Sequence, residues 1–152
     1  MGASPYMYLE QFNGDVEATL HALREREFRA GRYNPVISFP VTPINENSPA
    51  PGAQHQSIEE ALDDADADGA RCILDLDHIS DEPELCAACP IPAATLEEHF
   101  GTAQLTRAVF EAEQDAFWDI MEEVDRGTGV YTLLYDDNGE PNEIVFAGYS
   151  FD

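Results

Sequence analysis

Lysine is absent from this chain, and arginine supplies all seven of its basic residues. The absence of lysine excludes enzymes that form a Schiff base through a lysine side chain, and it excludes phosphate-binding P-loops, which need one. Against the seven arginines stand 31 acidic residues, so the formal net charge of the 152-residue chain is −24. An acidic surface of this strength repels phosphate, which disfavours nucleic acids and anionic membranes as direct partners.

Cysteine is scarce, and long apolar runs are missing. The three cysteines are an odd number in a chain large enough to fold without disulfides, which suits a reducing compartment. No apolar stretch approaches the ~20 residues that a membrane-spanning helix needs. Residues 1–12 also lack the charged start and apolar core of a signal peptide. We therefore expect a cytoplasmic protein with no membrane partner.

Length and composition predict one globular domain over residues 1–152. A chain of about 150 residues can bury roughly 70% of the surface that it exposes when unfolded. Hydrophobic residues make up 43% of the chain, which is ordinary for a folded protein. The charge is unevenly distributed: residues 1–32 carry a net charge of −1 and residues 33–152 a net charge of −23. The acidity therefore belongs to particular candidate surfaces.

Periodicity and turn residues predict an α+β fold of order β-α-α-β-α-β-β. We expect a mainly antiparallel sheet of about four strands, with the helices packed on one face. The run 72–76 is read as a strand, although it also fits helical spacing. The other predicted elements are a strand over 6–12, a helix over 102–125, a hairpin of 130–135 with 143–149, and proline-rich loops near 33–56 and 80–95. Two further helices are predicted from their ends: Asp15 caps a helix that Gly31 stops, and Ser57, with Glu60 three residues on, caps a helix that runs to about Asp68.

The run Asp64-Ala65-Asp66-Ala67-Asp68-Gly69 has the D-x-D-x-D-G spacing of a calcium-binding loop, and Asp75 stands at the final ligand position. Carboxylates at alternate positions can converge on a hard cation while the glycine makes the sharp turn. Three features depart from the pattern: the last ligand is Asp rather than Glu, Arg71 occupies a usually apolar position, and a strand rather than a helix is expected to follow. The alternatives are a calcium site formed by Asp64, Asp66, Asp68 and Asp75, and an acidic helix end exposed to water. No other cofactor is expected.

Cys86 and Cys89 have the C-x-x-C spacing of a redox dithiol or of half a zinc site. Pro90 and Pro92 follow where a redox motif would open a helix, and no second paired motif supplies further zinc ligands. We therefore favour structural cysteines. Carboxylates are the only abundant reactive groups, so a small enzyme would need a bound metal. The sequence favours a protein without catalytic activity and leaves a small metal-dependent enzyme as an alternative.

The most informative feature is a tryptophan amid acidic residues. On the predicted helix over 102–125, Trp118 projects away from the apolar stripe, and four acidic residues surround it: Glu111, Asp115, Asp119 and Glu122. This is typical of an interface anchor with carboxylates that steer a basic partner, unless the proline-rich loop covers the ring. Asp63 and its acidic neighbours form a second patch.

These observations predict a non-enzymatic, strongly acidic protein that binds another protein. The function that we favour is that of an inhibitor or bacterial immunity protein, antitoxin-like, which neutralises an intracellular toxin or enzyme through a basic surface. The acidic faces would imitate the charge of a nucleic acid. The main alternative is a calcium-binding module that uses the loop from Asp64 to Gly69.

Overall fold

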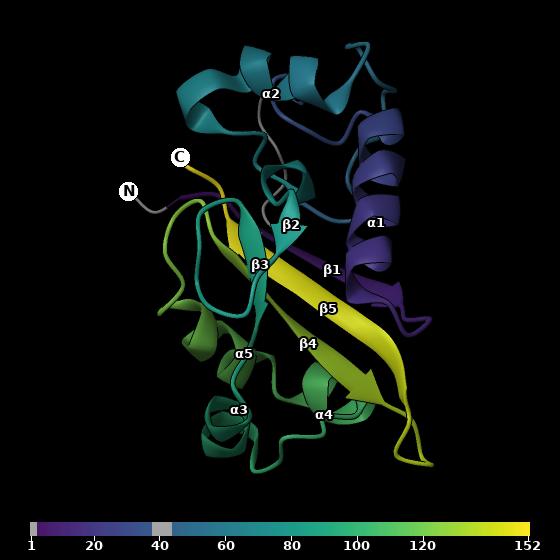
Figure 1. The fold of residues 1–152 in the computed structure, drawn as a ribbon, viewed down its shortest axis with the longest axis vertical. Helices are drawn as coiled ribbons and strands as arrows, with labels where there is room; N and C mark the ends of the chain where they lie inside the picture. The colour runs from purple at the N-terminus through teal and green to yellow at the C-terminus, as the bar shows by residue number, and fades with distance from the viewer. Residues whose placement is uncertain (1–2, 38–43) are drawn as a thin grey trace.

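In residues 3–37 and 44–152, which the structure (a computed structural model) describes, five strands form one mixed sheet (Figure 1). The strands are β1 (Pro5–Gln11), β2 (His78–Ile79), β3 (Ala87–Pro90), β4 (Gly129–Tyr135) and β5 (Pro141–Tyr149). Their order is β1-β5-β4-β3-β2. Strand β5 pairs antiparallel with β1 and β4, whereas β3 pairs parallel with β4 and β2. The α+β class is confirmed, but the sheet is mixed and larger than expected.

Five α-helices accompany the sheet in the described part of the chain. They are α1 (Val16–Ala30), α2 (Ile58–Ala65), α3 (Ala93–Phe100), α4 (Arg107–Ala112) and α5 (Gln114–Met121). Two short 3₁₀ turns, η1 (Asp66–Asp68) and η2 (Ile73–Asp75), follow α2. In Figure 1, α1 and α2 lie toward the upper end of the molecule, and α3, α4 and α5 lie toward the lower end.

Both faces of the sheet are covered, so the expectation of helices on one face only is wrong. The reason is visible in β1, whose side chains alternate between the faces. Tyr6 and Tyr8 enter a core cluster with α1 and η2, whereas Met7 and Leu9 pack against a second cluster with α3, α4 and α5. A strand with apolar residues on both sides needs a partner layer on each of them.

Local capping signals in the sequence are confirmed. The Asp15 side chain accepts a hydrogen bond from the Ala18 N–H at 2.9 Å and begins α1, and Gly31 ends this helix at φ +75°. The Ser57 hydroxyl accepts from the Glu60 N–H at 3.1 Å and begins α2. The hairpin predicted near the carboxyl end is present as β4 and β5. Each of these features depends on residues close together in the chain.

The predicted helix over 102–125 is not continuous. It breaks at Glu113, whose φ of −114° and ψ of 43° leave the helical region, and α4 and α5 lie on either side. The first of them, α4, begins only after Thr106, whose side chain accepts a hydrogen bond from the Val109 N–H. The break accompanies the edge-to-face packing of Phe110 and Phe117, whose ring centres are 5.2 Å apart in the second core cluster.

Two further expectations are corrected. The run 72–76, read as a strand, contains η2, because Asp75 turns back and accepts a hydrogen bond from the Ala70 N–H. The region 80–95, read as a loop, contains β3 and the start of α3. Pro92 precedes the first residue of α3, a place where proline is tolerated because those N–H groups have no partner within the helix. Of the loop near 33–56, residues 38–43 lie outside the described residues.

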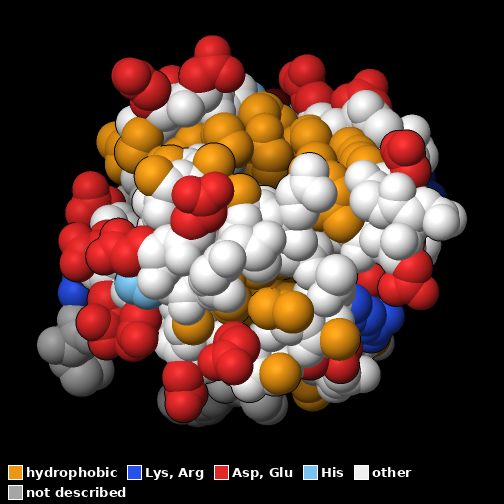
Figure 2. Space-filling view, turned by 90° about the horizontal axis from the view of Figure 1, so that it is seen from below, with side chains coloured by type: hydrophobic (Ala, Val, Ile, Leu, Met, Phe, Trp, Pro, Cys, Tyr) orange, Lys and Arg blue, Asp and Glu red, His pale blue; other side chains and the backbone are white. Residues whose placement is uncertain are grey.

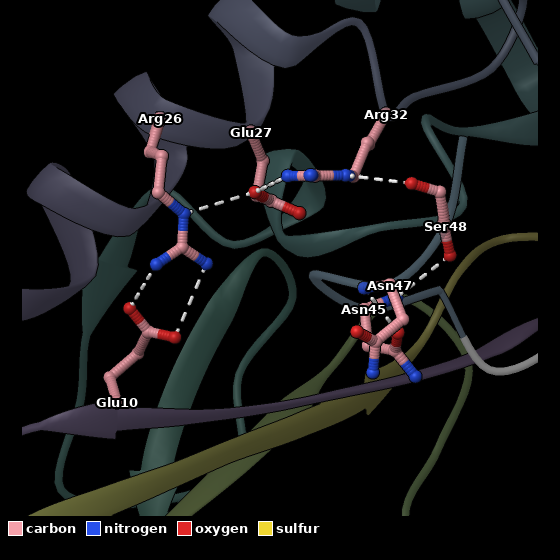
Figure 3. Close-up of polar contacts among 7 residues, drawn as sticks. All are labelled: Glu10, Arg26, Glu27, Arg32, Asn45, Asn47 and Ser48. Atoms are coloured by element: carbon pink, nitrogen blue, oxygen red, sulfur yellow. Dashed lines mark hydrogen bonds and ion pairs between the residues drawn. The ribbon is translucent and has the colours of Figure 1, made fainter. Parts of the chain in front are cut away.

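A buried carboxylate fastens α1 to its surroundings (Figure 3). The side chain of Glu27 is fully buried, and its Oε2 accepts from Arg32 at 2.7 Å and from Arg26 at 3.1 Å. Arg26 also binds both carboxylate oxygens of Glu10 on β1, and Arg32 donates to the Ser48 carbonyl at 3.0 Å. One charged residue thus ties helix, strand and loop together.

Glu27→Gln is expected to lower the free energy of unfolding by about 3 kcal/mol, because it leaves Arg32 in a largely buried site without its negative partner. Urea unfolding measures the change. Glu25→Gln is the matched control: its exposed pair with Arg29 on the same helix should contribute less than about 1 kcal/mol. Equal losses in the two variants would contradict a special role for the buried carboxylate.

Candidate partner-binding groove

The residues predicted to bind a partner are divided between two ends of the molecule. Asp63 lies on α2, at the upper end in Figure 1, and is exposed. The others lie at the lower end: Glu111 on α4, Asp115, Trp118 and Asp119 on α5, and Glu122 directly after it. On α5 the spacing of 115, 118, 119 and 122 keeps these side chains on neighbouring positions of one surface.

Trp118 is half-buried. Its ring packs edge-to-face against Phe117, with the ring centres 5.7 Å apart, and it lies against the second core cluster. Glu111 is held by Arg107 at 2.7 Å and is separated from α5 by the helix break at Glu113. The acidic face is therefore shorter than predicted and is centred on α5.

A groove beside α5 brings together acidic side chains from distant parts of the sequence. It encloses about 700 Å³ between α5, α3, the segment 81–83 and the adjoining strands β3 and β4. Its floor is largely apolar, with Cys89, Ile91, Ile120, Val124 and Val130. Around the floor stand six carboxylates and one imidazole: Asp81, Glu82, Glu98, Asp119, Glu123, Asp125 and His99.

The parallel pairing of β3 with β4 positions the floor. Cys89 lies directly beside Val130 in this register, so the two side chains project on the same side of the sheet. Ile91 continues the strand direction, with its N–H donating to the Tyr131 carbonyl at 3.0 Å. Ile120 is 5% exposed and approaches the same floor from α5. An apolar floor of this kind attracts the apolar parts of a bound group.

Four of the seven arginines contact groups away from the groove. Neither arginine nor lysine is among the described residues that line the groove, although six carboxylates are. These four arginines belong to α1 and its end: Arg24 donates to the Leu74 carbonyl, Arg26 and Arg32 contact the buried Glu27, and Arg29 pairs with Glu25 on the helix surface. The negative potential of the groove is therefore not neutralised by these arginines.

Seen from the lower end of Figure 1, this side of the molecule combines the two kinds of surface (Figure 2). Apolar side chains form a broad band across it, acidic side chains border the band, and basic side chains are few. Leu85, on the loop next to the groove, has 62% of its surface exposed. An exposed large apolar side chain beside a hollow is typical of a binding surface.

A histidine holds the loop that carries one wall of the groove. The His78 ring contacts Asp77 through Nδ1 and lies 2.8 Å from Glu84 through Nε2. These two carboxylates raise the pKa of His78, because each of them stabilises the charged imidazolium. The Cys86 N–H donates to the Gly127 carbonyl at 2.7 Å and fixes the other end of the loop. The wall is therefore anchored at both ends.

The cysteines lack the surroundings of reactive thiols. All three are free, and burial is the main cause that raises the pKa of each thiol, which disfavours the thiolate needed for redox or metal chemistry. Cys89 lies in the floor of the groove, whereas Cys86 precedes β3 at a φ of +63°. This arrangement agrees with structural cysteines.

Three of the four residues predicted to bind calcium, Asp64, Asp68 and Asp75, make contacts with other groups of the chain. Asp64 contacts His55 at 2.8 Å, and Asp68 lies 3.9 Å from Arg71. Asp66 starts η1 at a φ of +53°. Within the described ranges, no group of three or more His, Cys, Asp or Glu residues is arranged to hold a metal ion. Calcium binding at Asp64, Asp66, Asp68 and Asp75 stays a prediction, for which the test is calorimetric titration with calcium.

Asp75 has a structural partner instead. Its buried carboxylate accepts from the Ala70 N–H at 2.8 Å and lies 2.6 Å from the Ser150 hydroxyl. That hydroxyl also lies 3.0 Å from the Asp68 carbonyl, and its single hydrogen can serve only one of the two acceptors. Burial raises the pKa of Asp75, against these hydrogen bonds, which lower it. A protonated Asp75 would donate to Ser150 and free the serine hydrogen for Asp68.

Asp75→Asn is expected to gain stability relative to the wild type as the pH rises from about 4 to 7. Folding favours the protonated form of a carboxyl whose pKa is raised, and this contribution is present below about pH 4 and lost as the pH rises through the raised value. Asparagine has no such loss, and its amide N–H can donate to Ser150. Urea unfolding at several pH values measures the difference. Asp63→Asn, at an exposed position, is the control, and a difference for Asp75→Asn that stayed constant with pH would contradict the argument.

Sequence reasoning missed most of the acidic residues around the groove. Of the predicted partner residues, only Asp119 lines it. Asp81, Glu82 and Glu98 belong to the region predicted as a loop or to α3, and they meet α5 because β3 pairs with β4 and α3 packs against α5. The density of acidic residues near 81–84 and 119–125 was the one signal available, and it does not show which segments meet.

None of the helices in the described part of the chain is long and apolar enough to cross a membrane.

Comparison of the chain with protein-family models, with curated proteins and with solved structures finds no match.

Proposed function

We propose that this chain is a non-enzymatic binding protein that recognises a basic surface of another protein, in the manner of an inhibitor or immunity protein. The observation that carries the proposal is the groove beside α5, in which six carboxylates surround an apolar floor and no arginine or lysine is among the described lining residues. A basic toxin or enzyme would be blocked by occlusion of the surface that it uses for its own anionic substrate.

The two parts of this surface contribute at different distances. Carboxylates of one sign around a low-dielectric floor focus the potential and speed the encounter with a basic partner. At contact, the apolar floor, the exposed Leu85 and the half-buried Trp118 supply the area that is removed from water. Charge therefore supports the rate and the choice of partner, and apolar contact supports the lifetime of the complex.

The alternative surface is the acidic patch on α2. It contains Glu59, Glu60, Asp63 and Asp64, all exposed, and it is formed by one short helix. No residue of α2 lines the groove beside α5 or the two smaller hollows of about 230 and 240 Å³ in the described part of the chain. The groove is the better candidate because it combines charge with apolar surface.

Asp119→Asn combined with Glu123→Gln is expected to weaken binding of the partner about tenfold at moderate salt, because two carboxylates at the groove are lost. The partner is first recovered from an extract of the source organism at low and moderate salt, identified and purified, and its affinity is then measured by calorimetry. Glu59→Gln combined with Asp63→Asn is the matched control, since it removes the same charge from α2.

The outcomes separate the possible surfaces. Loss of binding only in the groove variant, together with a partner of basic charge, supports the proposal. Loss only in the α2 variant places the interface on α2 and contradicts it. Recovery of no basic protein at either salt concentration overturns the function itself.

A further inference from the structure

The chemistry of the groove selects among the positive groups that a partner could present. Phenylalanine, tyrosine and tryptophan are not among its described lining residues, so it lacks the aromatic cage that favours quaternary ammonium groups. The apolar floor is formed by Ile91, Ile120, Val124 and Val130, which offer no hydrogen bonds from their side chains. A strongly hydrated ammonium group would have to lose water over this floor, whereas a guanidinium group is weakly hydrated and has a long apolar stem.

The carboxylates are placed on different sides of this floor. Asp81 and Glu82 come from the loop before β3, Glu98 comes from α3, and Asp119 and Glu123 come from α5 and the segment after it. A planar guanidinium group has five N–H donors and can bind carboxylates along more than one edge. The chain uses this geometry itself where Arg26 binds both oxygens of Glu10 at 2.6 and 3.2 Å and also contacts Glu27.

We infer that the groove is the binding site for an arginine side chain of the basic partner, with the stem on the apolar floor and the guanidinium group among carboxylates of α3 and α5. This inference rests on the proposed function and adds the kind of residue that the partner presents. A volume of about 700 Å³ lies in the range of sites that enclose a whole small molecule, so neighbouring atoms of the partner segment also enter. The exposed Leu85 lies at the loop where an apolar neighbour of that arginine would make contact.

The test uses the full chain labelled with ¹⁵N and two small probes, N-acetyl-arginine methylamide and N-acetyl-lysine methylamide, at constant ionic strength. The arginine probe should shift the amide signals of Ile91, Ile120 and Val130 in a saturable way. It should bind about tenfold more tightly than the lysine probe, because the guanidinium group makes at least one more hydrogen bond to a charged acceptor. Asp119→Asn combined with Glu123→Gln should weaken this binding, and Glu59→Gln combined with Asp63→Asn should leave it unchanged.

Three results would overturn the inference: equal affinity for the two probes, shifts spread evenly over the acidic surface, or equal weakening by the two double variants. These results are distinguishable from failure of the proposed function. If the purified partner still depends on Asp119 and Glu123 while the arginine probe does not bind in the groove, the inference fails and the function stands. If the partner is indifferent to both positions, the function fails as well.

Discussion

The buried carboxylate of Glu27 is the contact on which the arrangement of the amino-terminal part depends. It holds Arg26 and Arg32, and through them α1 is fastened to Glu10 on β1 and to the carbonyl of Ser48. A charge this deeply buried persists only beside partners of opposite charge, because desolvation otherwise outweighs every other contribution (Figure 3). In a chain with seven arginines and 31 acidic residues, two of the few positive charges are thus paired with this one carboxylate.

The position of the arginines determines which carboxylates have a positive charge near them. The sequence places four arginines within or just after α1, and all four contact groups inside the fold or on the same helix. At the opposite end, six carboxylates surround the groove, and no arginine is among its described lining residues. Acidic residues occur along most of the chain, and these six are brought around one apolar floor by the fold.

The parts of the fold that could be predicted are those that depend on short separations in the sequence. Asp15 and Ser57 were predicted correctly as helix caps, since each capping bond joins residues three apart. The break at Glu113 could not be predicted, because it accompanies the packing of Phe110 against Phe117 and no glycine or proline marks it. The second layer of helices was missed for a similar reason: apolar residues on both faces of β1 predict it only once the strand is known to lie in the sheet with β5.

The candidate site was predictable only where it lies on one helix. Trp118 and Asp119 are neighbours on α5, but Asp119 lines the groove, whereas the Trp118 ring packs against Phe117 of the second core cluster. The rest of the groove depends on a parallel pairing between β3 and β4, which are about 40 residues apart and carry no local signal for each other. Helix α5 supplies one wall of the groove and also carries the acidic face beside it. The helix break at Glu113 sets the direction of α5, and with it the direction in which both acidic surfaces face.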